Sequence, residues 1–147
     1  MDDSIAIAAA LCRRFEGLYL KPYLCPAGVP TIGYGATRYE DGAPVRLTDP
    51  AITRERAEAL LQHQLRREFL PGVVQLCPGA DTPERVAALL DFAFNVGTGN
   101  LRASTLRRRV NAGDWDDART QLMRWNKAGG RVLPGLTRRR AAEAALI

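Results

Sequence analysis

The stretch FEGLYLKPYLCPAGVPTIGYGA, residues 15–36, decides the expected fold because its pattern differs from that of the flanking sequence. Proline and glycine recur every few residues and separate short apolar runs such as residues 29–32. Such punctuation favours short antiparallel strands and tight turns over a helix. We therefore expect a small antiparallel sheet in this part of the chain.

Helical patterns, with apolar residues at i, i+3 and i+4, flank this stretch on both sides. Ser4 is expected to cap a first helix that runs to Phe15. Thr53 opens the longest pattern, which extends toward Leu76 and which Pro71-Gly72 should kink or interrupt. Further helix starts are expected at four later positions, namely Thr82, Ser104, Asp114 and Thr137.

These patterns predict an α+β fold in one domain spanning residues 1–147. A sheet lobe is expected at about residues 13–52 and a linking helix at about 53–76. The larger helical lobe would then comprise about residues 77–147 together with 1–12. A composition of 46% hydrophobic and 25% charged residues is ordinary for a chain that buries a core.

The net charge of +5 is distributed unevenly. Residues 1–99 carry ten basic and twelve acidic side chains, whereas residues 100–147 carry eleven basic and four acidic ones. A basic segment of this kind suits an anionic partner, whether nucleic acid, a membrane surface or an acidic polymer such as a cell wall. It is equally compatible with a solvated face that has no partner.

The three cysteines, Cys12, Cys25 and Cys77, form no Cys-x-x-Cys pair, and His63 is the single histidine. A structural zinc site needs about four such ligands, so we expect no metal. An odd number of cysteines also argues against a disulfide framework, and we expect free thiols in a reducing compartment. His63 is expected on the surface of the linking helix.

Glu16 lies between the first helix and the sheet; eight residues separate it from Cys25, and five more separate Cys25 from Thr31. Since side chains alternate along a strand, Thr31, Gly33 and Gly35 are expected to share a face directed toward Glu16 and open to a bulky ligand. Inverting glycoside hydrolysis needs an acid at the leaving oxygen and a polar group that holds water across the sugar ring. By residue type alone, Glu16 is as readily a solvated or ion-paired carboxylate.

Three separated blocks resemble the phage-type lysozymes, or endolysins, of glycoside hydrolase family 24. The blocks are FEGLYLKPY with TIGYG (residues 15–23 and 31–35), FAFNVG with STL and NAGDW (92–97, 104–106 and 111–115), and RW, GG and LPGLTRRR with Glu143 (124–125, 129–130 and 133–140). They follow the family order across nearly the whole chain. The resemblance implies a lysozyme-like fold and a muramidase that hydrolyses the bond between N-acetylmuramic acid and N-acetylglucosamine in peptidoglycan, for host lysis.

The family's catalytic pattern is a Glu, then Asp or Cys after eight residues, then Thr after five. The resemblance therefore implies that Glu16 is the general acid, that Cys25 occupies the middle position and that Thr31 positions water. A thiol near its reference pKa of ~8.5 is mostly neutral at pH 7. Cys25 is then a thiolate, a hydrogen-bond partner of water, a nucleophile or a thiol without a role. Ala36 departs from relatives that commonly carry His there.

The family binds its glycan in a cleft between two lobes. The resemblance implies substrate-binding residues along that cleft, namely Tyr34, Gly35, Asn95, Ser104 and Arg138. Asn95 is alternatively a packing residue within an apolar helix. The segment Arg138–Arg140 is typical of a solvated helical face, although the family places one arginine of this helix near its catalytic Glu.

The implied partner is the glycan strand of peptidoglycan, bound by a monomer without a cofactor, nucleic acid or stable membrane insertion. The apolar run at residues 5–11 is shorter than the ~20 residues that span a bilayer and lacks a basic leader. With no signal peptide, accumulation in the host cytoplasm and release through a membrane lesion are expected. The alternatives are a lytic transglycosylase, a basic nucleic-acid-binding module and an inactive wall-binding domain.

Overall fold

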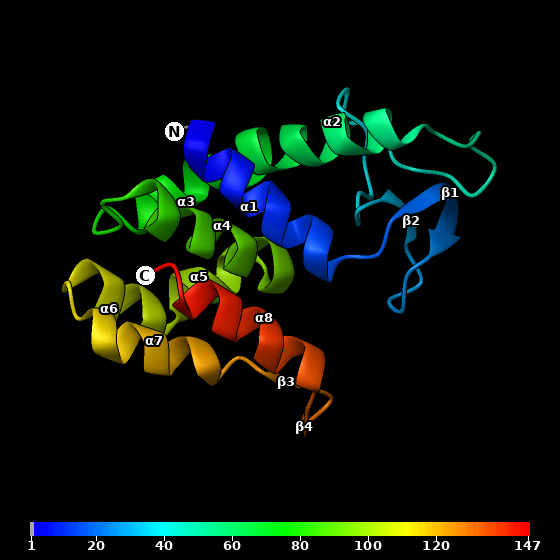
Figure 1. Cartoon of the computed structure of the whole chain (residues 1–147). Coiled ribbons are helices and arrows are strands. Elements are labelled where there is room, and N and C mark those ends of the chain that lie inside the picture. Colours follow the sequence, from blue (N-terminus) through cyan, green and yellow to red (C-terminus); the bar gives the residue numbers. More distant parts are fainter. Residues whose placement is uncertain (1) are drawn as a thin grey trace.

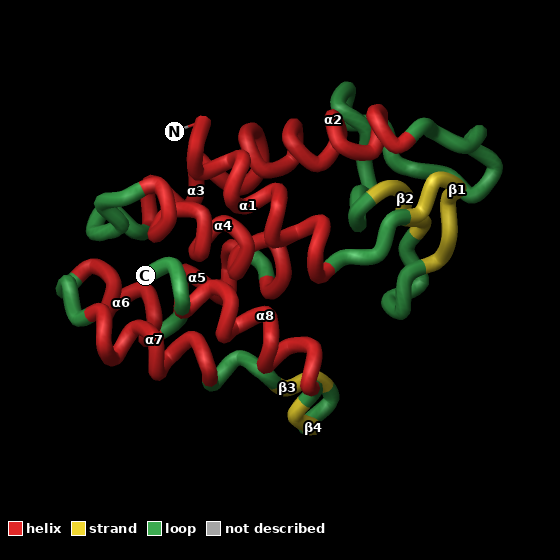
Figure 2. The backbone as a smooth tube through the Cα atoms, in the orientation of Figure 1, coloured by secondary structure: helices red, strands yellow, loops and turns green. Residues whose placement is uncertain are grey.

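The structure, a computed structural model, describes residues 2–147 and shows two parts that are built differently (Figure 1). Short strands and loops form one end of the molecule, and helices form the rest. The helix α2 (Arg54–Gln64) and its continuation run from the sheet end into the helical part, as the backbone trace makes plain (Figure 2). The predicted α+β fold, with a small sheet lobe and a larger helical lobe joined by a long helix, is confirmed.

Helix α4 (Pro83–Val96) forms the centre of the helical part. Every side chain from Val86 to Ala93 is buried, so this helix has no solvent-exposed face over two turns. Thr82 caps its start as predicted, accepting a hydrogen bond from the Arg85 backbone N–H. Gly97 ends it with a φ of 94°, a conformation that glycine adopts without a steric penalty.

The other helices surround α4 in two layers. Helices in direct contact with α4 are α1 (Asp2–Phe15), α3 (Leu70–Leu76), α5 (Thr98–Ala103) and α8 (Pro134–Ala144). The outer pair is α6 (Thr105–Asn111) and α7 (Trp115–Met123), with α7 packed on α8. Ser104 and Asp114 cap α6 and α7 as predicted.

Two predicted helix starts were wrong. Ser4 lies buried inside α1, which begins two residues earlier. Helix α8 begins at Pro134 instead of Thr137, because proline at the first helical position needs no hydrogen bond and its fixed φ already suits a helix.

The long helix continues without a gap through a π-helical turn, η1 (Leu65–Phe69), into α3. In this turn the Leu70 N–H donates to the Leu65 carbonyl, five residues back. Pro71 follows immediately, and its ring would crowd the carbonyl oxygen of an ordinary α-helical turn. The interruption predicted at Pro71-Gly72 is therefore present as the wider turn just before the proline.

The predicted antiparallel sheet is present and consists of β1 (Tyr19–Leu24) and β2 (Pro30–Gly33). Their connecting loop is closed by two backbone hydrogen bonds at Cys25. The Cys25 N–H donates to the Val29 carbonyl at 3.0 Å, and the Gly28 N–H donates to the Cys25 carbonyl at 2.8 Å.

Strand β2 ends at Gly33, so the predicted alternation of faces as far as Gly35 was wrong. Gly33 and Gly35 have φ values of 69° and 104°, which reverse the chain. The reversal lets Ile32 and Ala36 exchange backbone hydrogen bonds of 2.8 and 2.9 Å. The chain therefore turns back on itself immediately after the strand.

A second hairpin, which the sequence indicated only as a chain break, lies just before α8. Its strands are β3 (Lys127–Ala128) and β4 (Arg131–Val132). Gly129 and Gly130 form the two-residue turn with φ values of 58° and 79°. Positive φ at both positions is the requirement of the hairpin turn that matches the twist of its strands.

Two apolar clusters meet along α2. The smaller one joins Ile32, Ala36 and Val45 of the sheet lobe to Leu60. On the same helix, Ala57 and Leu61 belong to the large cluster around α4. Ala36 is 1% exposed within the smaller cluster, so this position contributes apolar packing.

The three cysteines are free thiols, with Cys12 and Cys77 buried and Cys25 partly exposed. His63 is half-buried and not fully on the surface as expected. None of the helices within residues 2–147 combines the length and the apolar character that a membrane crossing requires.

Leu90→Ala tests the central position of α4. Leu90 is fully buried, so the substitution should lower the free energy of unfolding by about 2 to 5 kcal/mol. Urea denaturation followed by circular dichroism measures the change. Val74→Ala, at a side chain that is 49% exposed, is the control and should change it by less than about 0.5 kcal/mol. Equal effects of the two substitutions would contradict the central role of α4.

Candidate functional site

Glu16 is fixed at the point where α1 ends. Its backbone N–H donates to the Cys12 carbonyl at 2.7 Å, which continues the last helical turn. A Cβ atom added to Gly17 would lie 2.9 Å from the Tyr19 ring, so glycine lets the chain pass this ring. The Glu16 side chain is 25% exposed, which leaves it accessible at the surface of a cavity.

Arg139, on α8, connects Glu16 to the core. Its Nη1 donates to Oε1 of Glu16 at 2.9 Å. Its Nε and Nη2 donate to the two carboxylate oxygens of Asp91 at 2.9 and 2.7 Å, a bidentate arrangement. The predicted solvated face was therefore wrong for Arg139 and Arg140, which are 3% and 0% exposed, while Arg138 is exposed.

The groups around Asp91 are held in defined protonation states. Burial alone would raise the pKa of Asp91, but hydrogen bonds from Arg139 and from Glu143 lower it below its ordinary value. Burial lowers the pKa of Arg139, yet its bonds to Asp91 and Glu16 outweigh burial and raise it. Burial, followed by the nearby Asp91 charge, raises the pKa of Cys12, whose thiol donates to Asp91 at 3.4 Å.

A second buried arginine adjoins this group. Arg140 Nη2 donates to Oδ1 of Asn95 at 2.8 Å and to Oε2 of Glu143 at 3.1 Å. Burial lowers the pKa of Arg140. Burial, followed by the hydrogen bond with Asp91, raises the pKa of Glu143 well above its ordinary value, while the charge of Arg140 lowers it; Arg140 Nε lies 2.9 Å from Oε1 of Glu143.

Sequence reasoning missed Asp91 and Arg140 as members of the site, and placed Glu143 only within a family block. The arginine that the resemblance implied near Glu16 is Arg139. One signal was present: Asp91 is a charged residue within a helix that is otherwise almost wholly apolar. A buried carboxylate requires a partner of opposite charge. The sequence did not show which arginine supplies it.

A cavity of about 550 Å³ opens beside Glu16. Two predicted substrate-binding residues, Asn95 and Arg138, line it together with Glu16. The other lining residues come from the end of α1 and the start of α8, namely Arg14, Phe15, Leu133, Gly135, Leu136 and Arg139. The cavity thus combines apolar walls with an acid and several cations.

Cys25 lies at the start of the loop after β1. The surrounding loop lowers the pKa of the Cys25 thiol, chiefly through the Val29 backbone and to a lesser degree through Ala27, Gly28 and the Thr31 side chain, whereas burial raises it. Thr31 is 3% exposed, and its hydroxyl donates to the Val29 carbonyl at 2.8 Å. The loop therefore supplies donors that stabilise a negative charge on the sulfur.

The surroundings of Tyr23 and Gly35 show how this loop lies with respect to Glu16. Burial, followed by the proximity of Tyr19, Cys25 and Glu16, raises the pKa of Tyr23. Tyr23 stands opposite Thr31 in the sheet register, and it is close to both Cys25 and Glu16. A Cβ atom added to Gly35 would lie 3.9 Å from Oε2 of Glu16.

The structure does not bring Tyr34 or Ser104 into the Glu16 cavity. Tyr34 is 7% exposed and borders a separate cavity beside α2. Ser104 accepts a hydrogen bond from the Arg107 N–H and donates one to the Leu101 carbonyl at 2.7 Å. The Tyr34 side chain is packed in the core, and the Ser104 hydroxyl caps α6. Neither side chain lines the cavity beside Glu16.

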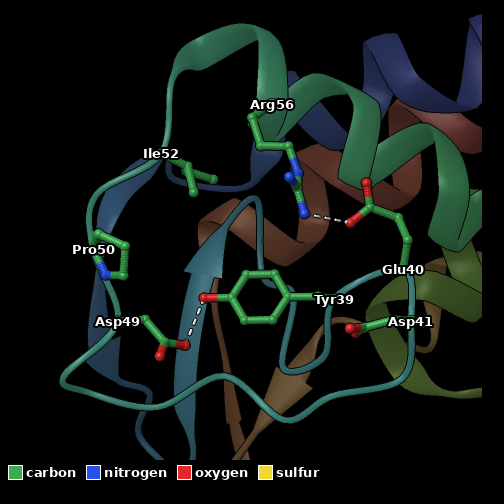
Figure 3. A pocket seen from close by; sticks show the side chains of 7 residues that line it. All are labelled: Tyr39, Glu40, Asp41, Asp49, Pro50, Ile52 and Arg56. Carbon is green, nitrogen blue, oxygen red and sulfur yellow. Dashed lines mark hydrogen bonds and ion pairs between the residues drawn. The ribbon is translucent and has the colours of Figure 1, made fainter.

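The sheet lobe has a further cavity of about 590 Å³ beside Tyr39 (Figure 3). Its polar groups are engaged with one another: the Tyr39 hydroxyl donates to Asp49 at 2.7 Å, and Arg56 pairs with Glu40 at 2.8 Å. Burial, followed by the bond to Asp49, raises the pKa of Tyr39 to about 12. In this cavity Asp49 and Glu40 are bonded to groups of the sheet lobe and of α2, whereas Glu16 in the other cavity is held from α8.

Comparisons with known proteins show which family the chain belongs to. The phage lysozyme family matches residues 13–143. An endolysin of Bacillus phage B103 is 40% identical over 141 residues, which cover 92% of this chain and 50% of that protein, so the chain spans about half of this relative's length. The endolysin from Escherichia coli O157:H7 phage FAHEc1 has a TM-score of 0.83 at 33% identity, covering 95% of this chain and 89% of that one. The muramidase domain of SpmX from Asticaccaulis excentricus has a TM-score of 0.77 at 33% identity, covering 95% and 92%.

The three thiols should differ in reactivity with iodoacetamide, which attacks thiolates. Because the pKa of Cys25 is lowered, its alkylation should reach half its maximal rate below pH 9.0, the ordinary value. Cys77 should react more slowly, since burial raises its pKa to about 11, and Cys12, which is fully buried, should react last. Mass spectrometry of peptides after timed alkylation measures the order. Faster labelling of Cys77 than of Cys25 would contradict the loop geometry.

Proposed function

The chain belongs to the phage lysozyme family, and on this premise we propose that it hydrolyses the bond between N-acetylmuramic acid and N-acetylglucosamine in bacterial peptidoglycan. The observation that carries the proposal is the position of Glu16. Its carboxyl group is partly exposed in a cavity, and the buried Arg139 side chain donates a hydrogen bond to it. An acid that must reach one glycosidic oxygen benefits from such a fixed orientation.

In the proposed reaction, Glu16 donates its proton to the leaving glycosidic oxygen. The guanidinium of Arg139, 2.9 Å from Oε1, then stabilises the carboxylate that remains. Asn95 and Arg138 line the same cavity and are proposed to bind polar groups of the glycan.

Cys25 and Thr31 are proposed to hold the attacking water on the opposite face of the sugar. The hydroxyl of Thr31 has one proton, which it donates to the Val29 carbonyl, so its lone pairs can accept a hydrogen bond from water. The lowered pKa of Cys25 increases the fraction of thiolate, which accepts a proton from water better than a thiol does.

Glu16→Gln tests the acid. The amide cannot donate the required proton, so turnover of purified peptidoglycan should fall at least about 100-fold with folding intact. Release of soluble reducing ends measures turnover. Glu55→Gln makes the same change at an exposed site on α2 and should retain full activity. Near wild-type activity of Glu16→Gln would refute the assignment.

Cys25→Ser and Cys25→Asp test the water-binding group. Replacing the thiol with serine removes a group of lowered pKa, so kcat should fall about 10- to 100-fold, whereas aspartate supplies a carboxylate base and should retain more activity than serine. The same reducing-end assay measures both. If neither substitution alters turnover, Cys25 is not a participant in the reaction.

The rivals predict other outcomes of these experiments. A lytic transglycosylase would leave 1,6-anhydro ends in place of reducing ends, which mass spectrometry of the products distinguishes. A nucleic-acid-binding module would show salt-dependent DNA binding without glycan cleavage. Against that module, Arg109, Arg119 and Arg139 of the basic segment are already paired with carboxylates of the chain.

The proposed substrate lies outside the cytoplasmic membrane. We propose that the protein reaches it after a stage in the host cytoplasm, once the membrane is breached. Lysis of intact cells only when a membrane-permeabilising agent is added, together with cleavage of purified walls without the agent, would support this order.

A further inference from the structure

We infer that Asp91 is a positioning residue for Glu16: it holds Arg139 in the one orientation that presents Nη1 to the catalytic carboxyl group. The inference rests on the proposed muramidase activity and concerns the same site. Asp91 is fully buried on α4 and does not touch the cavity, so any effect on the reaction passes through Arg139.

The geometry leaves Arg139 little freedom. Two parallel hydrogen bonds, Nε to Oδ2 at 2.9 Å and Nη2 to Oδ1 at 2.7 Å, fix the plane of the guanidinium against Asp91. Because the guanidinium group is planar, hydrogen bonds at Nε and Nη2 also fix the direction of the third nitrogen. That nitrogen, Nη1, lies 2.9 Å from Oε1 of Glu16.

Charged and titratable groups face Asp91 from two other helices, α1 and α8. The Cys12 thiol from α1 donates to Oδ1 at 3.4 Å, and Glu16 follows at the end of the same helix. Helix α8 contributes Arg139 and Glu143 directly, with Arg140 close by. All but Glu16 are buried, so solvent screens the interactions among them only weakly.

The charge of Asp91 affects the electrostatic environment of Glu16. Asp91 is the ionised carboxylate, since Arg139 and Cys12 donate hydrogen bonds to it, whereas burial raises the pKa of Glu143. The negative charge of Asp91 thus offsets the positive charge of Arg139 beside the catalytic acid. Without Asp91, Glu16 would face an uncompensated cation, which favours its ionised form.

Asp91→Asn is the primary test. With Arg139 released, kcat on purified peptidoglycan should fall about 10- to 100-fold, while KM stays within about twofold because the cavity is unchanged. The alkaline limb of the kcat profile, which reports loss of the acid's proton, should move about one pH unit lower. A merely structural residue would lower the amount of folded enzyme without moving the pH profile, and that result would overturn the inference.

Two matched variants serve as controls for Asp91→Asn. Asp81→Asn removes an exposed carboxylate that pairs with Arg85 at 2.8 Å, and it should leave kcat and its pH profile unchanged. Glu143→Gln should leave the alkaline limb in place, because the two hydrogen bonds between Arg139 and Asp91 do not involve Glu143. A shift after Glu143→Gln equal to that after Asp91→Asn would overturn the assignment of the charge to Asp91.

A spectroscopic measurement needs neither activity nor a stable variant. In the wild-type protein, the carboxyl 13C resonance of Asp91 should stay that of a carboxylate from pH 4 to pH 9, and a protected Arg139 Nε–H should be visible. A neutral Asp91, or an Arg139 Nε–H in free exchange with water, would overturn the inference. Wild-type protein that cleaves no glycan but shows both signals would refute the proposed function while leaving the positioning contact intact.

Discussion

The ion pair of Arg139 with Asp91 and Glu16 is the constraint on which the arrangement of this site depends. It joins α8, α4 and the end of α1, which are far apart in the chain: Arg139 and Glu16 are separated by 123 positions. Helix α4 is buried on all sides, so Asp91 offers a fixed reference inside the core. The carboxyl group of Glu16 is thereby connected, through Arg139, to the buried helix α4.

The other half of the site is built by a different principle. In the loop around Cys25 no cation is present; backbone N–H groups, that of Val29 foremost, stabilise charge on the sulfur. This loop depends on the short sheet, which in turn packs on α2 through Gly33 and Ala57. Ile32, which follows Thr31, belongs to the smaller apolar cluster, and Cys12, which donates to Asp91, belongs to the large one; both clusters include residues of α2.

Local sequence signals predicted most of the secondary structure. Caps such as Thr82, Ser104 and Asp114 act within three residues, so their effect can be derived from sequence alone. The errors arose where a longer-range or rarer geometry prevailed. The positive φ of Gly33 ended a strand that alternation would have continued, and Pro134 began α8 three residues before the predicted Thr137.

The site was predicted unevenly for the same reason. Glu16, Cys25 and Thr31 lie within one short segment and match a recognisable pattern, whereas Asp91 and Arg139 meet only once the helices pack. Periodicity placed Arg139 on a polar face because it carries no information on a distant carboxylate. Since a buried ion pair is often no more stabilising than an apolar pair of equal volume, stability is a weak reason to keep one here. Orientation of the acid accounts for it better, because an apolar pair could not direct a hydrogen bond to Glu16.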